Sequence, residues 1–124
     1  MNFDFNSETP IYIQIAKELE DAVFTGIYGE ETQIPSTTEL SVTLKINPAT
    51  VLKGMNILVS ENIIYKKRGV GMFVCKGARE IIIDKRRVHF IDDYIIPLMR
   101  EAEKLGLTEE EIKQLLERGY KNGH

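Results

Sequence analysis

The sequence predicts a mostly α-helical fold with one small β-hairpin, made of a compact N-terminal domain and a short helical extension. Three observations predict it. Two short helical segments lie a few residues apart around Ile46, two strand-like runs flank a glycine turn around Val70, and an apolar stripe with helical spacing extends over residues 88–105. We expect the boundary between the two parts after residue 77.

Length and composition limit the chain to one small core and an appendage. Its 124 residues are 43% hydrophobic and 28% charged, which is typical of a globular domain. The one cysteine, Cys75, excludes an intrachain disulfide and a zinc site built from several cysteines, and no role is assigned to it. No signal-peptide pattern and no apolar run of membrane-spanning length is present. We expect a cytoplasmic protein without a membrane partner.

Charge is unevenly distributed along the chain, although the net charge is only −3. Residues 1–44 contain eight acidic residues and one lysine, whereas residues 45–76 contain six basic residues and one glutamate. Because phosphate binding requires Lys and Arg, the basic segment is a candidate surface for nucleic acid.

The first helix is predicted to start at Thr9-Pro10, where a capping side chain precedes a proline at the first helical position. Apolar residues then recur at helical spacing as far as Val23, and Gly26 is suited to end the helix. We interpret residues 26–35 as a turn.

Two further helices follow, each with its own start signal. Ser36 and Glu39 form a capping box, in which the Ser hydroxyl accepts from the third backbone N–H and the Glu side chain reaches back to the Ser N–H. Asn47-Pro48 repeats the combination of cap and proline. Since only about three residues separate the two helices, they have the spacing of a helix-turn-helix.

A hairpin is predicted next. Residues 63–67 and 72–75 are strand-like and flank Arg68-Gly69-Val70-Gly71, a turn in which glycine permits positive φ. Together with the three helices, this wing makes residues 1–77 a winged helix-turn-helix domain.

Residues 78–124 are predicted to form a helical extension. Pro97 should kink or break its first helix near Ile96, and Thr108 opens a capping box for a last helix. The apolar stripe, with spacings of three and four, comprises Val88, Ile91, Ile95, Leu98, Ala102 and Leu105, with Tyr94 in a second strip beside it.

This stripe has two interpretations. It can fold back onto the N-terminal domain as core, or it can form a subunit interface. We favour dimerisation, because the winged helix has three helices to build its own core and a two-fold dimer matches a two-fold site in DNA.

The predicted function is sequence-specific binding of double-stranded DNA. The second helix of a helix-turn-helix lies in the major groove and directs its N-terminal residues at base edges. A basic hairpin alone is ordinarily a solvated surface, but beside a helix-turn-helix it favours a groove or phosphate contact. The capping box occupies Ser36 and Glu39, which leaves Thr37 and Thr38 free to face DNA. The candidate DNA-binding residues are Ser36, Thr37, Thr38, Asn47, Ala49, Thr50, Lys53, Lys67, Arg68, Gly69, Val70 and Gly71.

Several ordered motifs resemble the GntR family of bacterial regulators over about residues 10–75. They are Pro10-Ile11-Tyr12-Ile13-Gln14-Ile15, Ile34-Pro35-Ser36, Glu39-Leu40, Asn47-Pro48-Ala49-Thr50-Val51 and Arg68-Gly69-Val70-Gly71-Met72-Phe73-Val74. The tail from Glu101 to Thr108, leading into an acidic helix, is similar to that of the YtrA subfamily, whose members carry a small helical dimerisation extension instead of an effector domain. The resemblance implies a winged-helix transcription regulator. We expect a homodimeric repressor that covers a two-fold operator.

Two departures from the family pattern leave an alternative open. Thr38 stands where the family usually has Arg, and Val70 and Met72 stand where its wing has Lys and Thr. Either the operator differs from those usual for the family or the affinity for DNA is reduced. With the negative net charge, these losses also fit a winged helix used as a protein–protein interaction module, with weak or no specific DNA binding.

An enzyme is not expected. The sequence has no histidine paired with a nucleophile, no phosphate-binding loop and no metal-ligand cluster, and Asp92-Asp93 fits a solvated helix face. We therefore predict no catalytic residue, metal or cofactor. A pocket for an unknown small-molecule effector, between the winged helix and the tail, stays open.

Overall fold

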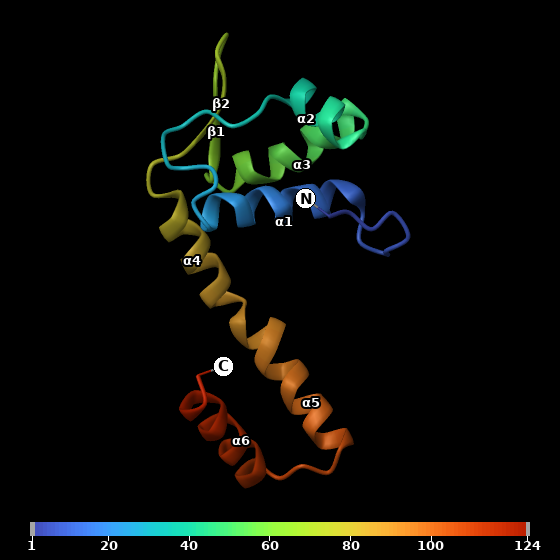
Figure 1. Cartoon of the computed structure of the whole chain (residues 1–124), viewed down its shortest axis with the longest axis vertical. Helices are drawn as coiled ribbons and strands as arrows, with labels where there is room; N and C mark the ends of the chain where they lie inside the picture. Colours follow the sequence, from blue (N-terminus) through green and yellow to red (C-terminus); the bar gives the residue numbers. More distant parts are fainter. Residues whose placement is uncertain (1, 124) are drawn as a thin grey trace. The chain divides into compact units, whose positions relative to one another are not determined.

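The computed structural model describes residues 2–123, and the chain divides into two compact units, one ending at Asp84 and the other beginning at Lys85. The first unit contains α1 (Ile11–Phe24), α2 (Thr37–Leu44), α3 (Pro48–Ser60), β1 (Ile64–Lys67), β2 (Gly71–Val74) and most of α4 (Ala78–Val88) (Figure 1). The second unit contains the end of α4, the π-helical turn η1 (Ile91–Ile95), α5 (Ile96–Lys104) and α6 (Glu109–Lys121). The mostly helical fold with one antiparallel hairpin is confirmed.

One hydrophobic core holds the first unit together. Ile15 and Leu19 of α1 and Met55 of α3 are fully buried in it, and burial of a side chain of this size contributes about 1.5–3 kcal/mol. Ile82 of α4 belongs to the same core. The compact unit therefore extends past residue 77, where we expected the domain boundary.

Helices α1 and α3 approach each other closely at Gly54. A β-carbon at this position would lie 2.7 Å from the Tyr12 carbonyl oxygen and 2.9 Å from Cγ2 of Ile15. Both atoms belong to the interior face of α1, where packing leaves little room for adjustment. Glycine thus permits the contact between α1 and α3, although it is a weak helix former.

Three of the predicted helix starts are confirmed. The Ser36 hydroxyl accepts from the Glu39 N–H at 3.0 Å, and Oε1 of Glu39 accepts from the Ser36 N–H at 3.2 Å. Asn47 accepts from the Ala49 N–H at 2.8 Å and caps α3, with Pro48 as its first residue. Thr108 caps α6 with a second capping box.

The start of α1 differs from the expectation. The N-cap of this helix is Pro10, and no side-chain hydrogen bond caps it. The Thr9 carbonyl instead accepts a hydrogen bond of 2.9 Å from the side-chain amide of Gln14, which also donates to the Asp4 carbonyl at 2.8 Å. The side chain of Gln14 therefore holds the segment that enters α1, a contact that the local cap signal could not reveal.

Replacing Ser36 tests the capping role. Ser36→Ala should lower the free energy of unfolding by about 1 kcal/mol, whereas Ser36→Gly should lower it by only a few tenths, because glycine is tolerated at an N-cap. Urea denaturation of the DNA-free protein measures both values. Equal losses for the two variants would contradict a capping role.

The hairpin pairs Ile64 with Val74 and Lys67 with Gly71. Its turn contains Gly69 at φ +77° and Gly71 at φ +145°, conformations that L side chains rarely adopt. The predicted glycine turn of the wing is therefore confirmed.

A third segment pairs with β2, where we expected only a turn. The Ile34 N–H donates to the Met72 carbonyl at 2.9 Å, and the Val74 N–H donates to the Thr32 carbonyl at 3.0 Å. Residues 31–34 thus connect the wing to the entry of α2. Such pairing depends on residues distant in sequence, which a local turn signal does not reveal.

Pro97 interrupts the helical path of the second unit as predicted. Directly before it, the Ile96 N–H donates to the Ile91 carbonyl, which produces the π-helical turn η1. Proline has no N–H to continue the α-helical pattern, and π turns commonly absorb such interruptions. No helix formed by the described residues is long and apolar enough to cross a membrane.

Candidate nucleic-acid interface

The first turn of α3 presents short polar and apolar side chains at the surface. Asn47 and Ala49 are exposed and Thr50 is half-buried. The side-chain oxygen of Asn47, Oδ1, accepts the capping hydrogen bond, so the side-chain nitrogen, Nδ2, is the group able to donate to DNA. This arrangement has the size and polarity of a base-reading helix end.

Lys53, one turn further along α3, is exposed, and its ammonium nitrogen lies 4.0 Å from the centroid of the Tyr12 ring. A cation–π contact at an exposed site contributes about 0.5–1 kcal/mol, which a phosphate can replace. No local pattern in the sequence indicates Tyr12 as a partner of Lys53, because the contact depends on the packing of α1 against α3.

The start of α2 holds three of the predicted DNA-binding residues, and their contact with DNA stays a prediction. The hydroxyl of Thr37 donates to Sδ of the buried Met55 at 3.4 Å, so its proton is already engaged within the unit. Thr38 is exposed, and Ser36 is occupied by the capping box. Thr38 is therefore the strongest candidate on this helix.

The wing exposes Lys67, Arg68 and Val70. Behind them, the rings of Tyr65 and Phe73 stack with centroids 5.8 Å apart, and the Lys67 ammonium lies 5.7 Å from the Phe73 centroid. The aromatic pair stiffens the strands, because cross-strand contacts of this kind stabilise a hairpin.

A further contact reaches the wing turn from outside the hairpin. The side-chain amide of Gln33 donates to the Val70 carbonyl at 3.0 Å. The sequence contains no signal for this bond, since its partners are 37 residues apart.

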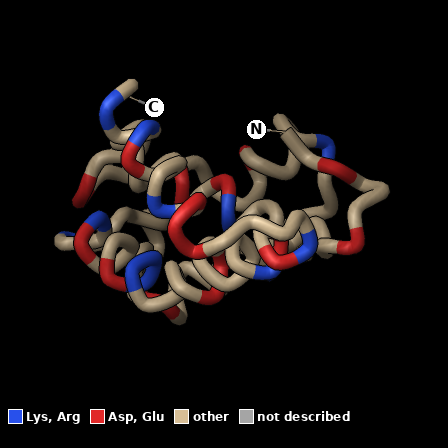
Figure 2. The backbone as a smooth tube through the Cα atoms, turned by 90° about the horizontal axis from the view of Figure 1, so that it is seen from below, with Lys and Arg blue, Asp and Glu red and all other residues tan. Residues whose placement is uncertain are grey.

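The structure places the DNA-facing candidates in the first unit. Figure 1 shows α2 and the hairpin on the side of α3 away from α1. Basic and acidic residues are intermixed along both units (Figure 2), so the exposed Lys53, Lys67 and Arg68 are local positive charges on a mixed surface. The chemistry of this surface suits phosphate contact at the edges and base contact at the first turn of α3.

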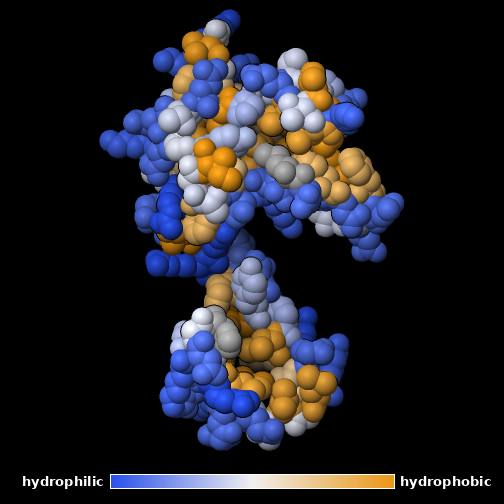
Figure 3. Space-filling model, viewed as in Figure 1, coloured by the Kyte–Doolittle hydropathy of each residue, from blue (hydrophilic) through white to orange (hydrophobic). Residues whose placement is uncertain are grey.

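The stripe assigned to dimerisation is largely exposed in the single chain. Val88 is 75% exposed, Leu105 is 66% exposed and Leu98 is 39% exposed, whereas Ala102 is only 7% exposed and already buried within its own unit. Ile91 and Tyr94 are exposed too, and Ile95 is half-buried. Apolar side chains gather on the visible face of the second unit (Figure 3).

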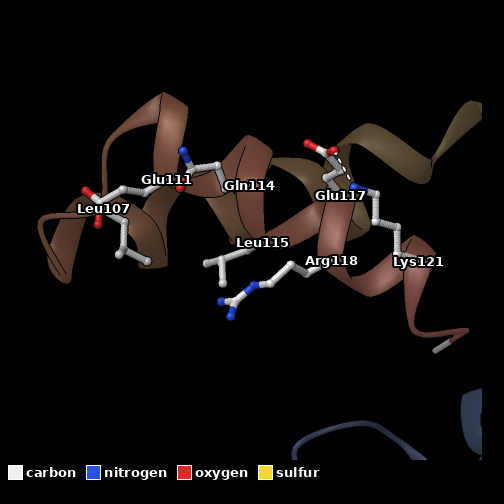
Figure 4. A pocket seen from close by; sticks show the side chains of 7 residues that line it. All are labelled: Leu107, Glu111, Gln114, Leu115, Glu117, Arg118 and Lys121. Atoms are coloured by element: carbon white, nitrogen blue, oxygen red, sulfur yellow. Dashed lines mark ion pairs between the residues drawn. The ribbon is translucent and has the colours of Figure 1, made fainter.

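Part of this apolar surface lies on α6, outside the stripe predicted from the sequence. Leu115, Leu116 and Tyr120 are exposed there. An open groove runs along α6, with Leu107 and Leu115 among its lining residues and an ion pair of 3.1 Å between Glu117 and Lys121 (Figure 4). Large exposed apolar areas on a small unit are typical of surfaces that a partner covers.

Cys75 packs against the core of the first unit. Burial raises the pKa of its thiol above the usual value. The thiol is therefore protonated at neutral pH, which fits a small packing residue.

Comparisons with known proteins agree with this geometry. Residues 11–74 match the family described as bacterial regulatory proteins, gntR family. The transcriptional repressor YtrA of Bacillus subtilis is 28% identical over 92% of this chain and 87% of its own length.

Two solved structures are similar as well. A GntR-family transcriptional regulator from Bacteroides thetaiotaomicron is 33% identical, with a TM-score of 0.75 over 92% of this chain and 99% of that one. AraR(DBD) in complex with its operator ORX1 is 27% identical, with a TM-score of 0.55 over 60% of this chain and 93% of that one. The chain therefore belongs to the GntR family of bacterial regulatory proteins.

Proposed function

We propose that the protein is a homodimeric transcription repressor that binds a two-fold operator, with one winged helix on each half-site. The observation that carries the proposal is that one compact unit contains both the exposed Asn47 and Ala49 at the start of α3 and an exposed basic wing. Two relatives support it, since YtrA of Bacillus subtilis is named a repressor and AraR(DBD) was solved on an operator.

Two groups of residues have different roles in DNA recognition. Short side chains at the ends of α2 and α3 read base edges, whereas basic side chains contact phosphates and the glycine turn permits close approach of the wing. The base-reading group is Thr38, Asn47, Ala49 and Thr50, and the phosphate and wing group is Lys53, Lys67, Arg68, Gly69, Val70 and Gly71.

Dimerisation is assigned to the second unit. Its exposed apolar residues, extended to Leu115 and Leu116 of α6, would be covered by a second copy of the chain. The two winged helices of the dimer then reach two half-sites. Where the operator overlaps a promoter, the bound dimer blocks access of RNA polymerase. A regulator of this kind acts on the chromosome, so we place it in the cytoplasm.

Removing two of the basic side chains tests DNA binding. Lys53→Ala combined with Arg68→Ala should raise the Kd for a duplex selected by the wild-type protein by about 10- to 100-fold at about 150 mM salt. The slope of log K against log salt concentration should become less steep, as expected for the loss of about two phosphate contacts per protomer. Fluorescence anisotropy at several salt concentrations measures both effects. The control Lys113→Ala removes a lysine of α6, whose ammonium pairs with Glu109 at 3.2 Å, and should leave the Kd unchanged.

The same variant separates this function from a protein-interaction module. Two features favour that second function. The net charge of −3 opposes binding to DNA, and the Lys53 ammonium is already engaged by the Tyr12 ring. A double variant that retains full regulatory activity in cells would support the interaction module and contradict operator binding.

A further inference from the structure

Gln33 connects two elements that the proposed function places on DNA, although it belongs to neither. It lies in the segment 31–34 that pairs with β2, just before the N-cap of α2. Its Nε2 donates to the Val70 carbonyl of the wing turn at 3.0 Å. A β-carbon at Gly71 would lie only 2.5 Å from the same nitrogen, so the amide occupies the space that a side chain at Gly71 would need.

The wing turn has few restraints of its own. Within it, the Val70 N–H donates to the Lys67 carbonyl at 2.9 Å. Gly69 lies at the exposed tip, and a β-carbon there would meet no described atom within 4 Å. A two-stranded hairpin is marginally stable by itself. The hydrogen bond from Gln33, which lies outside the hairpin, therefore contributes strongly to the position of the turn.

We propose that Gln33 is a positioning residue that holds the wing turn in its DNA-binding geometry, and that it acts through Arg68 without contacting DNA itself. This inference rests on the proposed function, since it assigns Arg68 to the DNA. Arg68 lies within the turn whose Val70 carbonyl Gln33 anchors. Ordering this turn before DNA arrives reduces the entropy lost on binding.

Gln33→Met tests the proposal, because methionine keeps the length of the side chain but cannot donate. In the DNA-free protein, amide hydrogen exchange of residues 68–71 should become about three- to tenfold faster, as expected for the loss of one hydrogen bond. Thr32→Val is the matched control. It removes a hydroxyl that donates to the Gly29 carbonyl at 2.6 Å in the same segment, and it should leave the exchange of the wing turn unchanged.

Binding to DNA gives the second measurement, on a duplex selected from a randomised pool by the wild-type protein. Gln33→Met should raise the Kd about three- to tenfold when Arg68 is present and should have a clearly smaller effect in an Arg68→Ala background. Unchanged exchange at the wing turn, an unchanged Kd, or an equal loss in both backgrounds would overturn the positioning role. If the wild-type protein selects no sequence from the pool, the proposed function itself fails, which is a different result.

Discussion

Leu98→Glu should convert the proposed homodimer into a monomer and raise the Kd for its proposed two-fold operator by about 10²–10⁴-fold. The physical reason is that two linked winged helices bind two half-sites with an effective concentration that separate monomers lack. Leu98 is 39% exposed on α5 in the single chain, within the apolar stripe. A carboxylate buried without a partner in this interface would also add the cost of desolvating its charge.

Analytical ultracentrifugation and anisotropy on the same samples measure the two effects. Arg100→Glu is the control, because Arg100 lies on the other face of α5 from Leu98 and the substitution changes the charge by more. It should leave the oligomeric state unchanged. A Leu98→Glu protein that remains a dimer would contradict the assignment of the stripe to the interface.

Gly54→Ala should destabilise the first unit by up to about 2 kcal/mol. Alanine in a helix ordinarily gains about 1 kcal/mol over glycine, but overpacking a well-packed core costs about 1–3 kcal/mol. A β-carbon at position 54 would lie 2.7 Å from the Tyr12 carbonyl oxygen, which α1 cannot move without disturbing its own core residues. Packing should therefore outweigh helix propensity.

Chemical denaturation with Gly29→Ala as control decides this prediction. A β-carbon at Gly29 would have Thr32 side-chain atoms as its nearest contacts, at 3.8 Å and 3.9 Å, which are ordinary van der Waals distances. The control should be neutral or slightly stabilising. A stabilised Gly54→Ala protein would show that α1 and α3 do not depend on close approach.

The features that the sequence predicts are those encoded over a few residues. The capping boxes at Ser36 and Thr108 and the cap at Asn47 each combine a side chain with backbone groups no more than three positions away. The glycine turn of the wing is closed by a backbone hydrogen bond between Val70 and Lys67. Their hydrogen bonds form whenever the local helix or turn forms. The order of helices and hairpin follows from these signals.

The features that the sequence does not reveal depend on tertiary packing. Thr37 has the same local environment as Thr38, and only the arrangement of α2 over α3 directs its hydroxyl to Met55. The contact of Gln33 with the wing, and that of Lys53 with Tyr12, likewise join segments that are distant in sequence. Ala102 matched the heptad spacing of the stripe but is covered within its own unit.

A hydroxyl-radical footprint of the wild-type protein on a selected genomic fragment tests whether the protein binds DNA as a two-fold dimer. We expect two protected half-sites related by two-fold symmetry, with centres about one or two helical turns apart, and a complex that weakens steeply as salt increases. Protection without symmetry or sequence preference, or no salt-dependent complex with any promoter fragment, would contradict a dimeric operator-binding regulator.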